Sequence, residues 1–366
     1  MSLPPKNGLE KIKPVTHGGL NYAELEELGI RPESIIDFST GINPLGAPTG
    51  LMEKLTAVSI ETYPDSGARE LTRALAENLK VQPDNILVGN GSSEVLWLCA
   101  AAYFSPGDRV VIIEPTFGEY ETASLMAGSL PVKVVLKSPD FPLDTAEVIA
   151  LARTNGAKGL FLCNPNNPTG TYISKREIVN LVDNLPGCLI ILDEAYKAFT
   201  DSAWPSEDLI RYGNVVVLRS MTKDYGLAGL RLGYALAEPA VIANLRRVCP
   251  PWNVNSMAQR AGVLALGEEG HVKKGYQVIR ESKEYLFREM IKLGLQPVPS
   301  KTNLFLVKVG WAAALRRDLL KKNIMVRDCS SFGLPEYIRL APRQIADCRR
   351  LIEALREVME KPVGAA

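Results

Sequence analysis

Residues 220–233 read Ser220-Met221-Thr222-Lys223-Asp224-Tyr225-Gly226-Leu227-Ala228-Gly229-Leu230-Arg231-Leu232-Gly233. The apolar run before them, residues 215–218, is typical of a buried strand, which would deliver Lys223 to the end of a sheet. Hydroxyl residues precede this lysine, glycines follow it, and an arginine comes eight residues after it. Hydroxyl, backbone and guanidinium donors bind phosphate, while an amine can form a Schiff base with a carbonyl. The stretch therefore predicts a lysine bonded to pyridoxal phosphate, beside the site of the cofactor's phosphate.

Length and charge narrow the classes of protein to be considered. A chain of 366 residues is long enough for about two domains with a substantial core. The 42 basic and 41 acidic side chains leave a net charge of +1, so no overall field favours nucleic acid or a membrane surface. We therefore expect no nucleic-acid or membrane partner, and instead a small molecule or a second copy of the chain.

The cysteines indicate a reducing compartment. Six are present, without the close spacing typical of zinc sites: Cys99, Cys163, Cys188, Cys249, Cys329 and Cys348. Four of them lie in apolar runs, which favours reduced thiols and a cytoplasmic protein without a metal site. The longest apolar run, residues 95–104, is too short to cross a bilayer. Residues 1–14 lack a signal-peptide core, and we expect them to form a flexible arm.

Short apolar runs alternate with amphipathic helical stretches from residue 85 onwards. The runs cover residues 86–89, 109–114, 132–136, 159–163, 189–192, 215–218 and 232–236. They predict an α/β fold with a mainly parallel seven-stranded sheet, whose ligands bind at the carboxyl ends of the strands. After about residue 245, longer helical stretches surround a few strands, which indicates a smaller α+β domain. We expect an N-terminal arm and small-domain segment over residues 1–45, a large domain over 46–245 and a small domain over 246–366.

Several strand ends carry residues suited to a flat, charged ligand. Gly91, Ser92 and Ser93 follow a strand and open a helix, where amides and hydroxyls could bind an anion. The alternative is an ordinary turn with a serine cap. Phe117 follows the next strand and could stack on a ring or simply belong to the core. Asn167 lies in the rigid turn of residues 164–170, where its amide could donate to a ring oxygen.

Asp193 lies at the end of an almost wholly apolar strand. A buried carboxylate without a partner would cost several kcal/mol, so we expect a cation beside it. A pyridinium nitrogen would meet that need and would keep the cofactor ring protonated. The alternative is a structural ion pair with an arginine. Tyr196, three residues later, could hydrogen-bond the ring's phenolate oxygen.

Together, the stretches 164–170, 193–196 and 220–233 resemble the fold-type-I pyridoxal phosphate enzymes of the class I/II aminotransferase group, over nearly the whole chain. The resemblance implies their transferase fold, with Lys223 bonded to the cofactor and Asp193 at its pyridine nitrogen. It implies Tyr196 and Asn167 at the ring hydroxyl and Phe117 stacked on the ring. The residues implied to hold the phosphate are Gly91, Ser92, Ser93, Ser220, Thr222 and Arg231. It also implies a homodimer with shared sites, in which Tyr63 reaches the neighbouring subunit's cofactor phosphate.

Two subfamilies with phosphorylated substrates compete, the threonine-phosphate decarboxylases of cobalamin synthesis and the histidinol-phosphate aminotransferases. The segments 17–19, 37–46, 250–255 and 327–332 resemble the decarboxylases. Gly41, Asp224 and Ala228 depart from the decarboxylase pattern, and residues 223–233 resemble the aminotransferases more closely.

Four residues are predicted to contact the substrate. The subfamily match places His17 at the substrate's phosphate, although a lone histidine is more often a surface or core residue. Asn43 belongs to the second matching segment. Arg339, in a short apolar strand, matches the arginine that binds a substrate carboxylate, and Arg327 matches a second arginine that would serve a phosphate. Either arginine could instead lie at the surface.

Three functions follow from these observations. The first hypothesis is a dimeric lyase that decarboxylates a phosphorylated amino acid such as threonine phosphate. The second is a transaminase of the histidinol-phosphate type. The third, from another class, is a regulator that has the cofactor fold without catalysis; the complete set of cofactor residues and the lack of an added DNA-binding segment argue against it.

Overall fold

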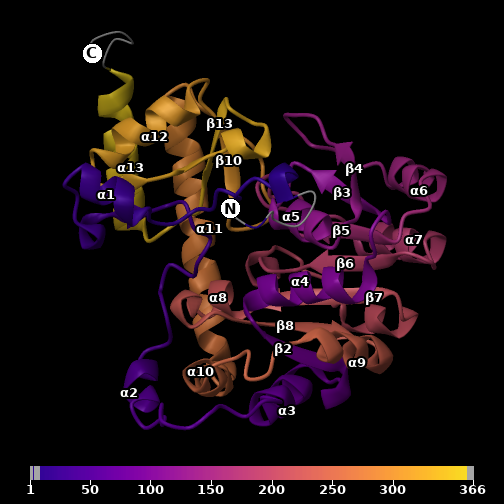
Figure 1. Ribbon diagram of the computed structural model, residues 1–366. Helices are drawn as coiled ribbons and strands as arrows, with labels where there is room; N and C mark the ends of the chain where they lie inside the picture. The colour runs from indigo at the N-terminus through magenta and orange to yellow at the C-terminus, as the bar shows by residue number, and fades with distance from the viewer. Residues whose placement is uncertain (1–2, 4–8, 361–366) are drawn as a thin grey trace.

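The computed structural model describes residues 3 and 9–360 and divides them between two domains (Figure 1). The large domain is built on a seven-stranded sheet with the order β2-β8-β7-β6-β5-β3-β4. Its strands are β2 (Ile86–Asn90), β3 (Arg109–Glu114), β4 (Leu130–Val135), β5 (Gly159–Cys163), β6 (Leu189–Asp193), β7 (Val215–Ser220) and β8 (Leu232–Ala237). Each overlaps one of the apolar runs, so the seven predicted strands and the α/β class are confirmed.

The sheet is mainly parallel, with one exception. Neighbouring strands in the part of the sheet from β4 through β3, β5 and β6 to β7 pair in parallel. Strand β8 instead runs antiparallel to both of its neighbours, β2 and β7. The connection from β7 to β8 spans only residues 221–231, which is too short for the helical crossover that a parallel return normally uses. This short connection is the stretch that carries Lys223.

Helices cover both faces of the large sheet, as the continuous apolar strands predict. One face packs against α2 (Leu51–Leu55), α3 (Arg69–Leu79), α6 (Thr145–Thr154), α7 (Lys175–Asn184) and α10 (Ser256–Leu266). The opposite face packs against α4 (Gly91–Tyr103), α5 (Glu119–Met126) and α9 (Pro239–Val248). Because successive strand residues point to opposite faces, each strand contributes alternately to the two cores.

The small domain is a four-stranded antiparallel sheet with the order β12-β13-β10-β9 and flanking helices. Its strands are β9 (Gln296–Pro297), β10 (Phe305–Lys308), β12 (Arg327–Asp328) and β13 (Tyr337–Leu340), and its helices are α12 (Ala312–Leu320) and α13 (Ile345–Met359). The N-terminal segment joins this domain, because β1 (Ile36–Asp37) pairs with β11 (Ile324–Met325) and α1 (Tyr22–Glu27) lies beside α12.

The long helix α11 (Glu269–Lys292) connects the two domains and is seen in orange in Figure 1. The last turns of α11 contribute Leu286 and Met290 to the core of the small domain. The preceding helix α10 packs in the core of the large domain, through Ala258, Ala261 and Ala265. The large domain thus extends past residue 246, the boundary expected from the change in helix length. Within residues 9–360, no helix is long and apolar enough to cross a membrane.

Candidate active site

A cavity of about 500 Å³ lies where the strands of the large sheet end, closed by the N-terminal segment and by the small domain. Most of the predicted site residues line it: His17, Gly91, Ser92, Ser93, Phe117, Asn167, Asp193, Tyr196, Ser220, Thr222, Lys223, Arg231, Arg327 and Arg339. They come from segments as far apart in the chain as those of His17 and Arg339, so the fold brings them together.

Asp193 is buried at the end of β6, with a relative exposure of 5%. Its Oδ2 accepts a hydrogen bond from the hydroxyl of Tyr120 at 2.8 Å, and its Oδ1 accepts one from the backbone N–H of Ala195 at 3.0 Å. Burial raises the pKa of Asp193, and these two donors act in the opposite direction. Among the described residues it forms no ion pair, so the alternative of a structural pair with an arginine is not realised. A cationic ring nitrogen fits this place.

Donors for a phosphate converge at the start of α4. Gly91 has a φ of +76°, and a Cβ there would lie 2.7 Å from Nη2 of Arg231. A Cβ at Gly233 would lie 2.3 Å from the backbone nitrogen of Ser92, so both glycines are required for this close approach. Helix N-termini bind anions through free amides, and the guanidinium adds a charge-assisted donor. The residues fit the phosphate of pyridoxal phosphate.

Hydroxyl groups complete this part of the cavity. The side chains of Ser220 and Thr222 hydrogen-bond each other at 2.6 Å, at the junction of β7 and the short helix α8 (Met221–Asp224). Lys223 follows, and its Nζ lies 5.7 Å from the centroid of the Tyr196 ring. The amine thus lines the same cavity as the phosphate donors and Asp193, where it could form a Schiff base with a cofactor carbonyl.

Phe117 and Asn167 both line this cavity. The Phe117 ring contacts the His17 ring at 5.7 Å and meets the Tyr120 ring edge-on at 5.7 Å. The side-chain oxygen of Asn167 accepts a hydrogen bond from Nη1 of Arg339. Because that oxygen is engaged, the amide nitrogen of Asn167 is the group left to donate, and its contact with a ring oxygen stays a prediction.

The small domain contributes two buried arginines. Nη2 of Arg339 donates to the backbone oxygen of Ser39, while its Nε has no hydrogen-bond partner among the described residues. Nη2 of Arg327 donates to the backbone oxygen of Thr16 at 2.6 Å and to the hydroxyl of Ser331 at 2.7 Å. Burial, followed by the positive charge of Arg339, lowers the pKa of Arg327 to about 10. Two adjacent cations in a partly dry cavity favour an anionic group of the substrate.

His17 is half-exposed and lies at the mouth of the cavity. Its Nε2 is 3.1 Å from Oε1 of Glu119, whose Oε2 accepts a hydrogen bond from the indole of Trp97 at 3.1 Å. The pKa of Glu119 is lowered by its hydrogen bond with His17. Glu119 was not among the predicted residues.

Two predicted residues lie outside the cavity. The side chain of Asn43 donates to the backbone oxygen of Asp224 at 2.8 Å and accepts from the backbone nitrogen of Leu45 at 3.0 Å. Both ends of the amide thus support the loop that carries Lys223, so Asn43 is not placed to contact a substrate. Tyr63 is 78% exposed and stacks on Trp252 with ring centroids 4.4 Å apart.

Tyr120, which holds Asp193, was also not among the predicted residues. It is fully buried in α5, and its ring stacks on that of Phe161 at 4.9 Å. A weak signal was present, because Tyr120 lies three residues after Phe117, and the two rings meet edge-on. The contact with Asp193 spans 73 residues and is visible only in the folded chain.

Comparisons with known proteins agree with this geometry. The family model described as aminotransferase class I and II matches residues 33–355. The histidinol-phosphate aminotransferase of Symbiobacterium thermophilum is 37% identical, over 97% of this chain and 98% of its own. The solved histidinol-phosphate aminotransferase of Sinorhizobium meliloti, in complex with pyridoxal-5'-phosphate, is similar with a TM-score of 0.87, 25% identity and 97% coverage of both chains. The L-threonine-O-3-phosphate decarboxylase of Porphyromonas gingivalis is similar with a TM-score of 0.79 and 29% identity, covering 88% of this chain and 99% of its own.

Replacing the lysine tests the cofactor assignment. We expect Lys223→Ala to lose the visible absorbance of lysine-bound pyridoxal phosphate, because no other amine occupies its place in the cavity lining. Absorbance spectra of the purified protein after incubation with the cofactor measure this loss. The control is Lys137→Ala, at an exposed lysine, which should keep the wild-type spectrum. A visible band retained in Lys223→Ala would refute the assignment.

The residue after this lysine predicts a pH dependence of stability. Burial raises the pKa of Asp224 from its ordinary value of 3.8 to about 7. Between these values the native state keeps a proton that the unfolded chain releases, so the free energy of unfolding falls as the pH rises through this interval. This fall should amount to on the order of 1 kcal/mol or more, and it should be absent in Asp224→Asn. Urea unfolding at pH values across the interval measures it.

An exposed aspartate provides the control for this pH series. Asp140→Asn should leave the slope of stability against pH as it is in the wild-type chain. If Asp224→Asn and Asp140→Asn gave the same slope, the carboxyl of Asp224 would not titrate in the expected range.

Proposed function

The chain belongs to the aminotransferase class I and II family, and on that premise we propose that it transfers the amino group of a phosphorylated amine, with histidinol phosphate as its substrate. The premise makes the chain a pyridoxal phosphate enzyme of fold type I. The observation that carries the proposal is the pair of buried arginines, Arg327 and Arg339, in the lining of the same cavity as Lys223. Their charge suits the phosphate of a substrate bound in this cavity.

Pyridoxal phosphate, when bound, supplies an electron sink for the bond that breaks at the substrate's amine-bearing carbon. Asp193 orients the ring and favours the protonated state of its nitrogen, since a buried carboxylate pairs best with a cation. The amine of Lys223 would take the proton from that carbon as general base. The side-chain oxygen of Asn167 holds Arg339, so its amide nitrogen would be the group that donates to the cofactor.

Decarboxylation of threonine phosphate is the second candidate. It was the first hypothesis from the sequence, and the position of His17 in the cavity lining and the structural likeness to a decarboxylase support it. The curated relatives that match most of the chain are named histidinol-phosphate aminotransferases, which favours transamination. The hypothesis of a non-catalytic regulator is not supported, because the chain is an enzyme of this family.

A homodimer and a cytoplasmic location complete the proposal. Tyr63 and Trp252 form an exposed aromatic pair, and Tyr63 lies in the position that the family resemblance assigns to contact with a second subunit. Exposed aromatic surface of this kind is typical of protein interfaces. The described cysteines are free thiols, in keeping with a reducing compartment.

Two substrate assays separate the candidate reactions. One incubates the purified enzyme with histidinol phosphate and 2-oxoglutarate, and the other with threonine phosphate alone. We expect glutamate to form in the first and no carbon dioxide to be released in the second. Carbon dioxide release without an oxo acid would favour the lyase instead. If neither substrate changed the cofactor's absorbance, both assignments would fail.

A substitution tests the phosphate contact. Arg327→Gln should raise KM for histidinol phosphate by about 10-fold or more, with a smaller change in kcat, because a charge-assisted contact to the bound substrate is lost. Steady-state kinetics measure both constants. The matched control is Arg350→Gln, at an exposed arginine of α13, for which we expect wild-type constants. An unchanged KM in Arg327→Gln would place the phosphate elsewhere.

A further inference from the structure

Two adjacent strand ends supply the groups nearest the cofactor's reactive parts. Asp193 ends β6, and Ser220 ends β7, followed by Lys223. The strands pair in parallel, with Asp193 opposite Leu218. The distance and angle between these two strand ends therefore determine how the carboxylate and the lysine face one ligand.

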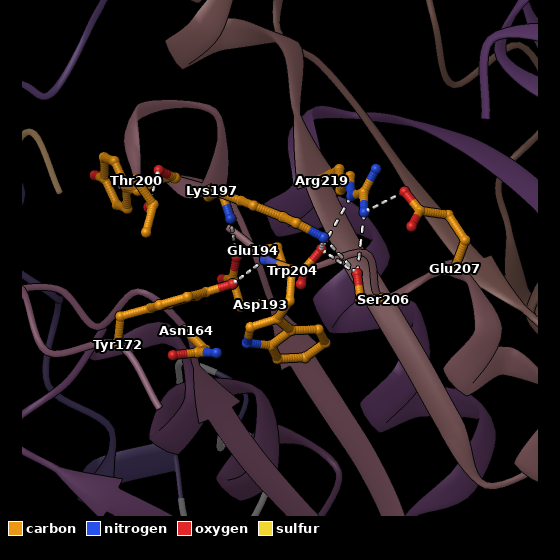
Figure 2. Close-up of polar contacts among 12 residues, drawn as sticks. Asn164, Tyr172, Asp193, Glu194, Lys197, Thr200, Trp204, Ser206, Glu207 and Arg219 are labelled. Carbon is orange, nitrogen blue, oxygen red and sulfur yellow. Dashed lines mark hydrogen bonds and ion pairs between the residues drawn. The ribbon is translucent and has the colours of Figure 1, made fainter. Parts of the chain in front are cut away.

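The residues beside these groups point to the opposite face of the sheet. Strand side chains alternate, so Glu194 leaves the face occupied by Asp193, and Arg219 leaves the face occupied by Ser220. The two meet there, with Nε of Arg219 donating to Oε2 of Glu194 at 3.0 Å (Figure 2). A charge pair behind the sheet thus joins the immediate neighbours of two site residues.

Two further side chains complete this contact, and we call Glu194, Arg219, Lys197 and Ser206 the brace. Oε2 of Glu194 also accepts from Nζ of Lys197 at 3.1 Å and from the hydroxyl of Ser206 at 2.7 Å. Nζ of Lys197 donates to Ser206 at 2.7 Å, and Nη2 of Arg219 to the same hydroxyl at 3.0 Å. Figure 2 shows the four side chains converging at one point.

The brace is buried, and its three charged side chains are stabilised by one another rather than by solvent. The side chain of Glu194 is 0% exposed, and those of Lys197 and Arg219 are 14% exposed. Trp204 covers Nζ of Lys197, with its ring centroid 5.5 Å away. All three donors reach Oε2, and Oε1 has no hydrogen-bond partner among the described residues. Breaking a buried pair leaves an uncompensated charge, so this cluster resists displacement.

We propose that Glu194 and Arg219 are positioning residues, which hold Asp193 and Lys223 in a fixed relation by joining the ends of β6 and β7 from behind the sheet. The inference needs only the family's cofactor and does not depend on which substrate is used. A fixed relation matters because a displacement of about 1 Å at a reacting group can reduce a rate about 100-fold.

The charge of Glu194 also reaches the site. The pKa of Asp193 is raised first by burial, and the neighbouring negative charge of Glu194 raises it further. Removing that negative charge should disfavour the protonated, cationic form of the lysine-bound cofactor nearby. We therefore expect Glu194→Gln, which keeps the shape of the side chain, to alter the protonation of the lysine-bound cofactor as well as the rate.

The test compares Glu194→Gln with Glu207→Gln in the loaded enzyme. Glu207 is the matched control, because its Oε1 contacts the same Arg219 at 2.7 Å but it is not attached to β6. For Glu194→Gln we expect the pH midpoint of the cofactor's visible absorbance to fall by about half a unit or more. We expect kcat to fall about 10-fold with KM within about twofold. Glu207→Gln should leave the midpoint and kcat at wild-type values.

A purely structural role would give a different result. If both variants lowered the melting temperature alike, and neither moved the absorbance midpoint or kcat, the inference would be overturned. Should Glu194→Gln give no soluble protein, Ser206→Ala replaces it, since it removes only the bridging hydroxyl. We then expect kcat to fall several-fold with the cofactor still bound; a wild-type kcat for Ser206→Ala would equally overturn the inference.

Discussion

A buried carboxylate without a cation from the protein is the constraint on which this structure depends. Asp193 ends a strand whose other residues are apolar, and a hydroxyl and a backbone amide are its hydrogen-bond donors. Leaving a buried charge without a counter-ion costs several kcal/mol, so the site is complete only with a cationic ligand. The ring nitrogen of pyridoxal phosphate would satisfy this requirement.

The two faces of the large sheet serve different purposes at this point. The face covered by α4 and α5 carries Asp193 and Ser220, which line the cavity, and Tyr120, whose hydroxyl donates to Asp193. The opposite face holds the charged brace around Glu194 and Arg219. Strand alternation makes this division possible, because each site residue has a neighbour that points the other way and can be anchored independently. Cofactor chemistry and mechanical support therefore occupy consecutive residues.

The substrate end of the cavity is assembled differently. Its arginines come from β12 and β13 of the small domain, and the N-terminal segment contributes the carbonyl that holds Arg327. These segments are short and irregular, and short motifs in them resemble the decarboxylases. Similarity over almost the whole chain instead favours the aminotransferases. The two signals differ because the cofactor site is common to both reactions, whereas the choice of the bond that breaks depends on a few contacts around the substrate.

The sequence by itself determined the α/β fold and the seven strands, and it predicted the candidate cofactor residues that follow these strands. These features depend on short-range patterns, in which an apolar strand ends and a functional residue comes next. Only the tertiary structure revealed Tyr120 at Asp193, the support that Asn43 gives to the Lys223 loop, the reach of the large domain through α10, and the brace behind the sheet. Each of these joins residues far apart in the chain, and side-chain contacts at such separations arise from packing, which no local pattern records.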